Sequence, residues 1–312
     1  MHQALILTKY PDEYARLIHE ATLPGLTTIA TSEVADGVAR GGDSAIVLGD
    51  PARVVQALPH LPRLQWVQLS WAGVEPMLDP ALRRDYILTN VRGVFGPLMS
   101  EFVFGYLLAH ERKMRLRDEA QRAGRWDTTL PGTLGGRTMG LVGVGSIGAH
   151  LASTAKHFGM TVRGYTRSSE NCPQVDRYFH GPDTVAFARG VNYLVAVLPH
   201  TTATSRIVDA GMLNALSPGA VVVNAGRGDT LDTGALVKAL TEKQLAAAVL
   251  DVFEQEPLPA DHVLWRTPGV SITCHTAAPS FPADIVSVFA ENYRRFARGE
   301  PLQYRVDFDR GY

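Results

Sequence analysis

Arg227, Asp251 and His275 each stand at or just beyond the end of a short apolar run, and Glu256 follows Asp251 in a proline-rich loop. An arginine binds and polarises carboxylate or carbonyl oxygens through its planar fork of donors. A histidine beside a carboxylate transfers protons near neutral pH. If the apolar runs are parallel strands, these side chains meet at the carboxyl edge of one sheet, where ligands bind. One such residue alone is more often structural, but the shared edge makes the group a candidate for catalysis.

A glycine-rich turn precedes this group in the chain. Residues 139–148 read MGLVGVGSIG, an apolar run with glycines at G-x-G-x-x-G spacing, and a helical pattern follows. Gly143 allows a sharp turn, Gly145 keeps a Cβ away from a pyrophosphate, and Gly148 lets the helix pack close to its strand. The spacing alone is a weak signal, but the strand pattern at 161–165 completes a βαβ unit of suitable size. The segment therefore predicts a dinucleotide site, with the phosphates at the helix N-terminus.

The elements that must position these residues follow a regular alternation of strand and helix patterns, which predicts an α/β fold. Strands are expected at 4–7, 45–48, 66–69 and 86–88 and, from the glycine motif onward, at 139–142, 161–165, 193–198, 220–224, 246–250 and 270–273. The first group forms an α/β layer of its own, and the second has the order of a doubly wound parallel sheet. Between them, a helical pattern runs from Leu98 into the basic stretch 112–117 and a turn-rich loop at 124–136. We expect this helix to link the two blocks and to provide a dimer surface.

Composition excludes several classes of protein. The 312 residues suit about two domains, and 46% hydrophobic with 20% charged residues allows substantial cores. A net charge of -1 gives no electrostatic case for a nucleic-acid partner. No apolar stretch is long enough for a signal peptide or a bilayer span. Cys172 and Cys274 have no metal-ligand spacing. We therefore expect a reduced, cytoplasmic protein with no metal, no disulfide and no membrane partner.

Four stretches together resemble the D-isomer-specific 2-hydroxyacid dehydrogenases, in particular their glyoxylate/hydroxypyruvate reductase branch. They are 143–148 (GVGSIG), 224–228 (NAGRG), 250–259 (LDVFEQEPLP) and 275–278 (HTAA). The resemblance implies two doubly wound parallel-sheet domains. A Rossmann dinucleotide-binding domain is expected over 98–277, and a discontinuous, flavodoxin-like substrate domain over 1–97 and 278–312. The implied activity is NAD(P)H-dependent reduction of small 2-keto acids to D-2-hydroxy acids.

The resemblance also assigns roles to individual residues. The catalytic Arg, Glu and His of the family fall on Arg227, Glu256 and His275. His275 then donates a proton to the keto oxygen, Glu256 favours its imidazolium form, and Arg227 binds the substrate carboxylate and keto oxygen. The expected substrate-binding residues are Trp71, Ala72, Gly73, Val74 and Arg227. The expected cofactor-binding residues are Gly143, Gly145, Ser146, Ile147, Gly148, Thr166, Arg167, Ser168, Leu198, Pro199, His200, Thr204, Ala225, Gly226, Arg227, Asp251, His275, Ala277 and Ala278.

Two residues depart from the family pattern, and two alternative functions stay open. Cys274 stands where proline usually precedes the catalytic histidine, and Trp71 stands where a small residue is common, so that its indole would narrow the pocket or stack on the substrate. Formate dehydrogenases share the fold and the arginine but pair the histidine with glutamine, so Glu256 favours hydroxyacid chemistry. The other alternative is a dinucleotide-sensing binding protein of the same fold with little turnover.

The residues after strand 161–165 bear on the choice of cofactor. Thr166 stands where an acidic residue binds the ribose hydroxyls in NAD enzymes. Without that carboxylate nothing repels a 2′-phosphate, which Arg167 and Ser168 can bind. We expect NADP to be preferred over NAD; the alternative is that Arg167 stacks on the adenine without selecting either cofactor. The expected assembly is a homodimer that acts on a small 2-keto or 2-hydroxy acid.

Overall fold

The computed structural model describes residues 1–311, and the chain divides into two compact units. Unit 1 comprises Met1–Val94 and Ser280–Tyr312, and unit 2 comprises Phe95–Pro279. These boundaries lie three residues before and two residues after the ones expected from the sequence, because helix α4 already begins at Gly96 and the loop that carries His275 continues to Pro279. Tyr312, the last residue of the expected substrate domain, lies outside the described residues.

Unit 1 is built on a five-stranded parallel sheet in the order β2-β1-β3-β4-β5, the flavodoxin order. The strands are β1 (His2–Leu7), β2 (Leu26–Thr31), β3 (Ile46–Gly49), β4 (Trp66–Leu69) and β5 (Ile87–Thr89). The sequence did not predict β2. This edge strand has no fully buried residue, so its sequence LTTIAT lacks the continuous apolar run that marks β3 and β4.

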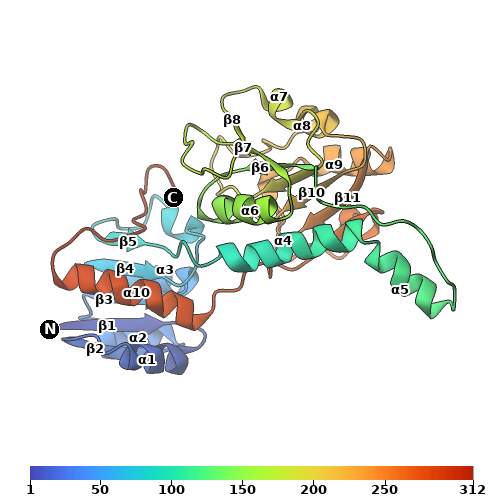
Figure 1. Ribbon diagram of the computed structural model, residues 1–312. Helices are drawn as coiled ribbons and strands as arrows, with labels where there is room; N and C mark the ends of the chain where they lie inside the picture. The colour runs from blue at the N-terminus through green and yellow to red at the C-terminus, as the bar shows by residue number, and fades with distance from the viewer. Residues whose placement is uncertain (312) are drawn as a thin grey trace. The chain divides into compact units, whose positions relative to one another are not determined.

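The helices of unit 1 include one from the far end of the chain. They are α1 (Pro11–Glu20), α2 (Val34–Gly41), α3 (Pro51–Ala57) and α10 (Pro282–Ala297), with 3₁₀ turns η1 (Leu58–His60) and η2 (Glu75–Leu78). Helix α10 packs beside α1 (Figure 1). The Phe289 ring of α10 stacks on Trp66 of β4 at a centroid distance of 5.2 Å, and Asn292 donates to Gln68 Oε1 at 3.1 Å. The C-terminal segment therefore completes the first sheet.

Unit 2 is built on a seven-stranded parallel sheet in the order β12-β11-β10-β9-β6-β7-β8. The strands are β6 (Thr138–Val142), β7 (Thr161–Tyr165), β8 (Arg177–Phe179), β9 (Tyr193–Ala196), β10 (Ala220–Asn224), β11 (Leu245–Leu250) and β12 (Val270–Ile272). The strand order reverses between β6 and β9, so the topological switch point lies directly after the glycine motif. The short edge strand β8 was not predicted, and the strand expected to reach residue 198 ends at Ala196.

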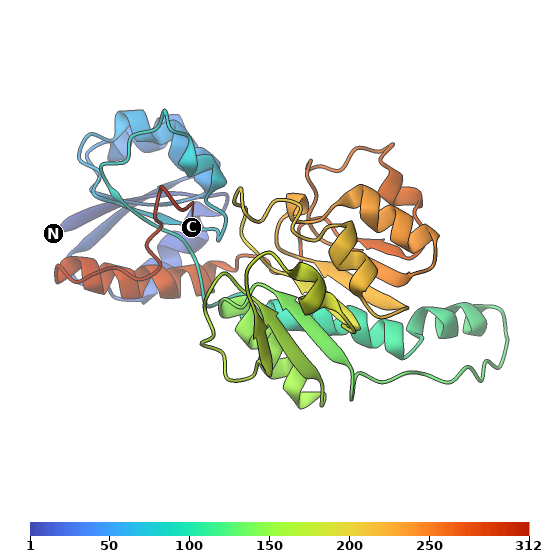
Figure 2. The ribbon, with the colours of Figure 1, turned by 90° about the horizontal axis from the view of Figure 1, so that it is seen from above.

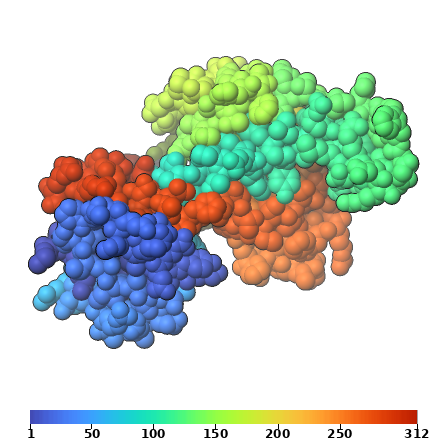
Figure 3. Space-filling model, turned by 60° about the horizontal axis from the view of Figure 1, so that its bottom comes forward, coloured from blue at the N-terminus to red at the C-terminus, as the bar shows by residue number. Residues whose placement is uncertain are grey.

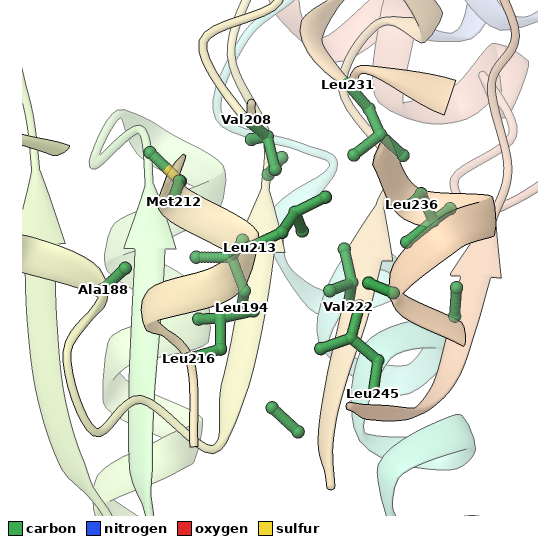
Figure 4. Close-up of a cluster of buried hydrophobic side chains, with 14 of the residues drawn as sticks. Ala188, Leu194, Val208, Met212, Leu213, Leu216, Val222, Leu231, Leu236 and Leu245 are labelled. Atoms are coloured by element: carbon green, nitrogen blue, oxygen red, sulfur yellow. The ribbon is translucent and has the colours of Figure 1, made fainter. Parts of the chain in front are cut away.

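Both faces of this sheet are covered. The helices are α4 (Gly96–Glu111), α5 (Met114–Arg122), α6 (Ser146–His157), α7 (Thr184–Ala188), α8 (Ala210–Ala215) and α9 (Thr233–Thr241), with 3₁₀ turns η3 (Gly228–Thr230) and η4 (Val263–Arg266). Leu194 and Val222 point to the face covered by α8 and α9 (Figure 4). Their neighbours Val195 and Val223 join a second cluster with residues of α4 and α6. Each such buried side chain contributes about 1.5–3 kcal/mol.

The long helix expected from Leu98 through Met114 is not continuous. Helix α4 ends at Glu111 and α5 begins at Met114, because Lys113 takes a left-handed conformation with φ 56°. The end of α4 is fixed by Glu111, whose buried carboxylate accepts from Tyr193 Oη at 2.6 Å. Helix α5 and the segment after it extend beyond the sheet of unit 2 (Figure 2), and the green residues of this part of the chain lie at one end of unit 2 in the space-filling view (Figure 3). That segment exposes Trp126 and Leu130 almost completely.

Candidate active site

The glycine turn at the switch point has the geometry that its sequence predicted. Gly143 adopts φ +104°, a conformation that L side chains rarely take. A Cβ on Gly148 would lie 2.2 Å from the Gly143 carbonyl oxygen, so only glycine lets α6 start this close to β6. Around Gly145 there is open space, since a Cβ there would meet nothing within 4 Å among residues 1–311.

The N-terminus of α6 has no side-chain cap among the described residues, so its first N–H groups, those of Ser146, Ile147 and Gly148, remain available to an anion. The loop after β9 lies beside this glycine turn. A Cβ on Gly143 would lie 2.9 Å from the Leu198 side chain, so the turn and the β9 loop are in contact. The turn thus offers an uncapped helix end beside open space, as a pyrophosphate requires.

The segment that carries Arg227 is pressed between two neighbouring loops. A Cβ on Gly226 would lie 2.8 Å from the backbone of Leu198, and one on Gly228 would lie 1.8 Å from the Phe253 carbonyl carbon. The Arg227 carbonyl accepts from Asn224 Nδ2 at 2.9 Å, which ties the segment back to β10. Arg227 itself is half-buried, and one of its guanidinium nitrogens donates to the Gly226 carbonyl at 2.8 Å. The backbone that carries Arg227 is therefore closely packed on both sides and hydrogen-bonded to β10.

His275 and Glu256 form a close pair at the same edge of the sheet. The Nδ1 atom of His275 lies 2.8 Å from Glu256 Oε2, and the other carboxylate oxygen accepts from the Phe253 N–H at 2.9 Å. The histidine side chain is exposed. Because Nδ1 faces the carboxylate, Nε2 is the nitrogen left to transfer a proton. The pair thus has the arrangement of a general acid with an orienting carboxylate.

Asp251 holds the loop that presents His275. It is 1% exposed, and its carboxylate accepts from Thr273 Oγ1 at 2.5 Å and from the N–H groups of Thr276 and Ala277 at 2.8 and 3.1 Å. The Asp251 carbonyl accepts from the His275 N–H at 2.8 Å. His275 needs this support because its φ of 55° is a conformation that costs a non-glycine residue about 1–3 kcal/mol.

The loop expected to bind substrate lies in unit 1, directly after β4. Its carbonyls are used internally, since Trp71 accepts from the Val91 N–H at 3.2 Å and Ala72 accepts from Asn90 Nδ2 at 2.7 Å. Within residues 1–311, the N–H groups of Ala72, Gly73 and Val74 make no hydrogen bond. Trp71 is 49% exposed. The loop is thus anchored by its oxygens and can donate from three successive residues.

The residues after β7 form a closed turn. Thr166 is buried, and its hydroxyl donates to the Ser169 carbonyl at 2.7 Å, so that Arg167 and Ser168 stand exposed at the tip. His180, at the end of β8, lies 2.9 Å from the Thr166 carbonyl oxygen. Strand β7 is thus followed by a threonine hydroxyl and not by a carboxylate, as the sequence indicated.

Comparison with known proteins identifies the family of the chain. The family model of the NAD binding domain of the D-isomer specific 2-hydroxyacid dehydrogenases matches residues 104–277. The chain belongs to this family. Glyoxylate/hydroxypyruvate reductase A of Salmonella choleraesuis (strain SC-B67) is 32% identical to this dehydrogenase over 257 residues, which cover 80% of this chain and 82% of that protein.

Two solved structures resemble the dehydrogenase along its whole length. A D-isomer specific 2-hydroxyacid dehydrogenase family protein from Aeromonas salmonicida subsp. salmonicida A449 is 42% identical, with a TM-score of 0.93 over 99% of each chain. The NADPH-dependent glyoxylate/hydroxypyruvate reductase from Sinorhizobium meliloti, solved with NADP and sulfate, is 26% identical, with a TM-score of 0.85 over 100% of each chain. The predicted fold class, two doubly wound parallel-sheet domains, is confirmed.

The remaining residues expected to contact the cofactor fall into two groups in the dehydrogenase. Ile147, Ala225, Ala277 and Ala278 pack in one apolar cluster with Met99 and Phe102 of α4. The β9 loop forms a compact turn, in which Thr204 Oγ1 donates to the Pro199 carbonyl at 2.8 Å and His200 Nδ1 lies 2.7 Å from Asp229 Oδ2. All expected catalytic and cofactor residues thus belong to unit 2, and residues 71–74 belong to unit 1.

Several contacts around the site were not visible in the sequence. The Asp251 carboxylate accepts three hydrogen bonds from the loop that carries His275, and the place of Asp251 among the cofactor residues stays a prediction. Asn90 and His180 were not singled out, because they follow short strands whose ends the apolar pattern did not define. Among the described residues, no helix could cross a membrane and no cluster of three or more His, Cys, Asp or Glu side chains could hold a metal ion.

The Asp251→Asn variant tests the loop support. An amide directs its NH₂ group toward N–H donors, so one or two charge-assisted hydrogen bonds are lost, and we expect a loss of about 2–4 kcal/mol in stability. Displacement of His275 should also lower kcat about tenfold or more. Thermal unfolding and steady-state kinetics measure the two effects. Asp261→Asn, a change at an exposed position of the following loop, is the matched control and should change neither. Parent-like behaviour of both variants would refute the role of Asp251.

Proposed function

We propose that this dehydrogenase reduces small 2-keto acids of the glyoxylate or hydroxypyruvate type to D-2-hydroxy acids, with NAD(P)H as the reductant. The observation that carries the proposal is the His275–Glu256 pair, 2.8 Å apart, at the sheet edge that also bears Arg227. The names of two relatives agree with it, because both the Salmonella and the Sinorhizobium proteins are called glyoxylate/hydroxypyruvate reductases.

The fit of a dinucleotide rests on the glycine turn. The positive φ of Gly143, the open space at Gly145 and the uncapped start of α6 together provide a place for a pyrophosphate. Ser146, Ile147 and Gly148 would hold it through their N–H groups. The apolar cluster around Ala225 and the β9 loop would line the rest of the cofactor site. When bound, NAD(P)H supplies the hydride, and the protein supplies binding, orientation and the proton.

The residues of the chain supply the acid and the anion-binding groups. Glu256 accepts from His275 Nδ1 and orients the ring, so that Nε2–H can pass a proton to the keto oxygen. Arg227 polarises that oxygen and binds the adjacent carboxylate as negative charge develops. From the family resemblance we propose that Trp71, Ala72, Gly73 and Val74 of unit 1 take part in substrate binding. A glutamate at 256, rather than a glutamine, supports proton transfer and argues against formate oxidation.

Replacement of His275 by alanine tests the reaction. We expect kcat for reduction of glyoxylate and hydroxypyruvate to fall by about two to four orders of magnitude, the usual contribution of a general acid. His157→Ala, a change at an exposed histidine of α6, is the control and should leave kcat unaltered. A near-normal kcat in His275→Ala would refute the assignment. If the parent bound NADPH tightly but turned over no small 2-keto acid, the chain would be a dinucleotide sensor instead.

We propose further that NADPH is the preferred cofactor and that Arg167 and Ser168 bind its 2′-phosphate. Thr166 keeps the end of β7 without a negative charge, and its bond to Ser169 holds the two residues at the tip of the turn. A phosphate with nearly two negative charges forms charge-assisted hydrogen bonds with such donors. The Sinorhizobium relative, described as NADPH-dependent and solved with NADP, supports the same choice of cofactor.

The Arg167→Ala variant tests cofactor selection. One charge-assisted contact to the phosphate implies a loss of about 10- to 100-fold in kcat/KM for NADPH. The value for NADH, which lacks the phosphate, should change little. Arg189→Ala, at another exposed arginine of unit 2, should change neither value. Equal losses for both cofactors would mean that Arg167 stacks on the adenine and does not select.

We propose that the enzyme is a homodimer joined through α4, α5 and residues 123–136. In this arm 95% of Trp126 and 86% of Leu130 are exposed. Large apolar side chains exposed together often mark an interface with another protein chain. We expect light scattering at micromolar concentration to give about twice the mass of the 33.9 kDa chain. Replacement of Trp126 and Leu130 by aspartate together should lower that mass, whereas Val185→Asp on α7 should not. A single-chain mass for the parent would refute the dimer.

We also propose a cytoplasmic location. Cys172 and Cys274 are both free thiols, and Cys274 is exposed directly beside His275. A reducing compartment would protect such a thiol from oxidation and mixed disulfides.

A further inference from the structure

The side chain of His180 links β8 to the turn that bears Arg167. Its Nδ1 atom lies 2.9 Å from the Thr166 carbonyl oxygen and 3.2 Å from the Thr166 hydroxyl. Its Nε2 atom lies 2.7 Å from Glu170 Oε1. Because the Thr166 hydroxyl donates its own proton to the Ser169 carbonyl, it can only accept from His180. Both ring nitrogens of His180 therefore face hydrogen-bond acceptors.

This geometry requires two donors from one imidazole. A neutral histidine carries a single N–H, whereas the imidazolium ion carries two. The full set of contacts to Thr166 and Glu170 is thus made only by protonated His180. On deprotonation the ring must give up one of them, and the Glu170 carboxylate then faces either a lone pair or solvent.

Glu170 lies close to the proposed phosphate-binding residues. It follows Arg167 by three positions, so the two Cα atoms are at most about 11 Å apart. At low ionic strength, where the Debye length reaches about 30 Å at 0.01 M salt, the charge of Glu170 acts on a phosphate held by Arg167.

Within residues 1–311, few other titratable groups face His180. The Tyr178 ring stacks on it with centroids 6.3 Å apart. Burial raises the pKa of the Tyr178 phenol, so this neighbour stays neutral across the relevant pH range. On β8, the Arg177 guanidinium lies over Phe179 at 4.6 Å. Among the described residues, Glu170 is thus the acidic group that pairs with protonated His180.

We infer that the His180–Glu170 pair makes the preference for NADPH depend on pH. While His180 is protonated, it neutralises Glu170 and fixes the turn through Thr166. When His180 loses its proton, the uncompensated carboxylate repels the 2′-phosphate and the turn loses one of its two ties. The inference rests on the proposed phosphate site at Arg167 and Ser168, and it makes His180 a positioning residue for cofactor selection.

The direction of the effect follows from the proton. The hydrogen bond to Glu170, and then the one to the Thr166 carbonyl, raise the pKa of His180 above its ordinary value. The proton is therefore retained at lower pH and lost as the pH rises through this raised value. Selection for NADPH should be strongest below that pH and weaker above it.

The experiment measures kcat/KM for NADPH and for NADH with the full-length enzyme at about pH 6.5 and about pH 9 at low salt. The ratio of the two values removes effects common to both cofactors, including those on the proton-transfer step. We expect Glu170→Gln to raise the NADPH:NADH ratio about two- to fivefold above the parent at high pH, where the parent carboxylate is uncompensated, and to make the ratio less dependent on pH. His180→Gln should show the lower ratio of the high-pH parent at both pH values.

Comparison with Glu170→Gln also separates the effect of the His180–Glu170 pair from the titration of the 2′-phosphate, whose second proton leaves near pH 6 in every variant. A ratio that follows the same pH course in the parent and both variants would overturn the inference. Arg167→Ala separates this failure from failure of the phosphate site. If Arg167→Ala removes the NADPH preference while Glu170→Gln and His180→Gln behave as the parent, only the role of the pair is refuted.

Discussion

The site depends on how closely three strand-end loops approach one another. The backbone at Gly226 lies against Leu198 after β9, and the backbone at Gly228 lies against Phe253 after β11, with no room for a Cβ at either position. This crowding fixes the peptide that carries Arg227 from both sides. It also brings the β9 loop, the arginine segment and the Glu256 loop to one edge of the sheet. A side chain at either glycine would have to separate loops that carry different parts of the chemistry.

The histidine is held by a different device. Its left-handed backbone is maintained by Asp251, whose carbonyl and carboxylate together bind three consecutive N–H groups, those of His275, Thr276 and Ala277. Glu256 then sets the direction of the ring through a single hydrogen bond. One buried acid thus positions the loop, and one exposed acid orients the side chain. The two carboxylates lie only five residues apart in the sequence, yet their burial gives them separate tasks.

Sequence patterns predicted the elements that are buried or that use glycine for a geometric reason. Strands such as Ala220–Asn224, buried at every position, and the Gly143 turn were read correctly because burial and positive φ restrict which residues can occur there. The edge strands β2 and β8 were missed, since half-exposed strands carry mixed residues. The break at Lys113 was missed because no glycine or proline marks it; a tertiary contact of Glu111 fixes it. Contacts such as His180 to Thr166 join residues 14 apart through a strand pair, and no local pattern encodes them.

The return of α10 to the first sheet has a consequence for biosynthesis. Trp66 and Gln68 of β4 find their partners in Phe289 and Asn292, which lie more than 220 residues later in the chain. During synthesis, all of unit 2 leaves the ribosome before those partners do. The indole of Trp66 in the nascent first sheet therefore stays uncovered while the second unit can already fold. Chaperone dependence and aggregation of truncated chains should accordingly originate in unit 1, which is formed by two separate segments of the chain. Unit 2 is a single continuous segment and can fold without residues that are synthesised later.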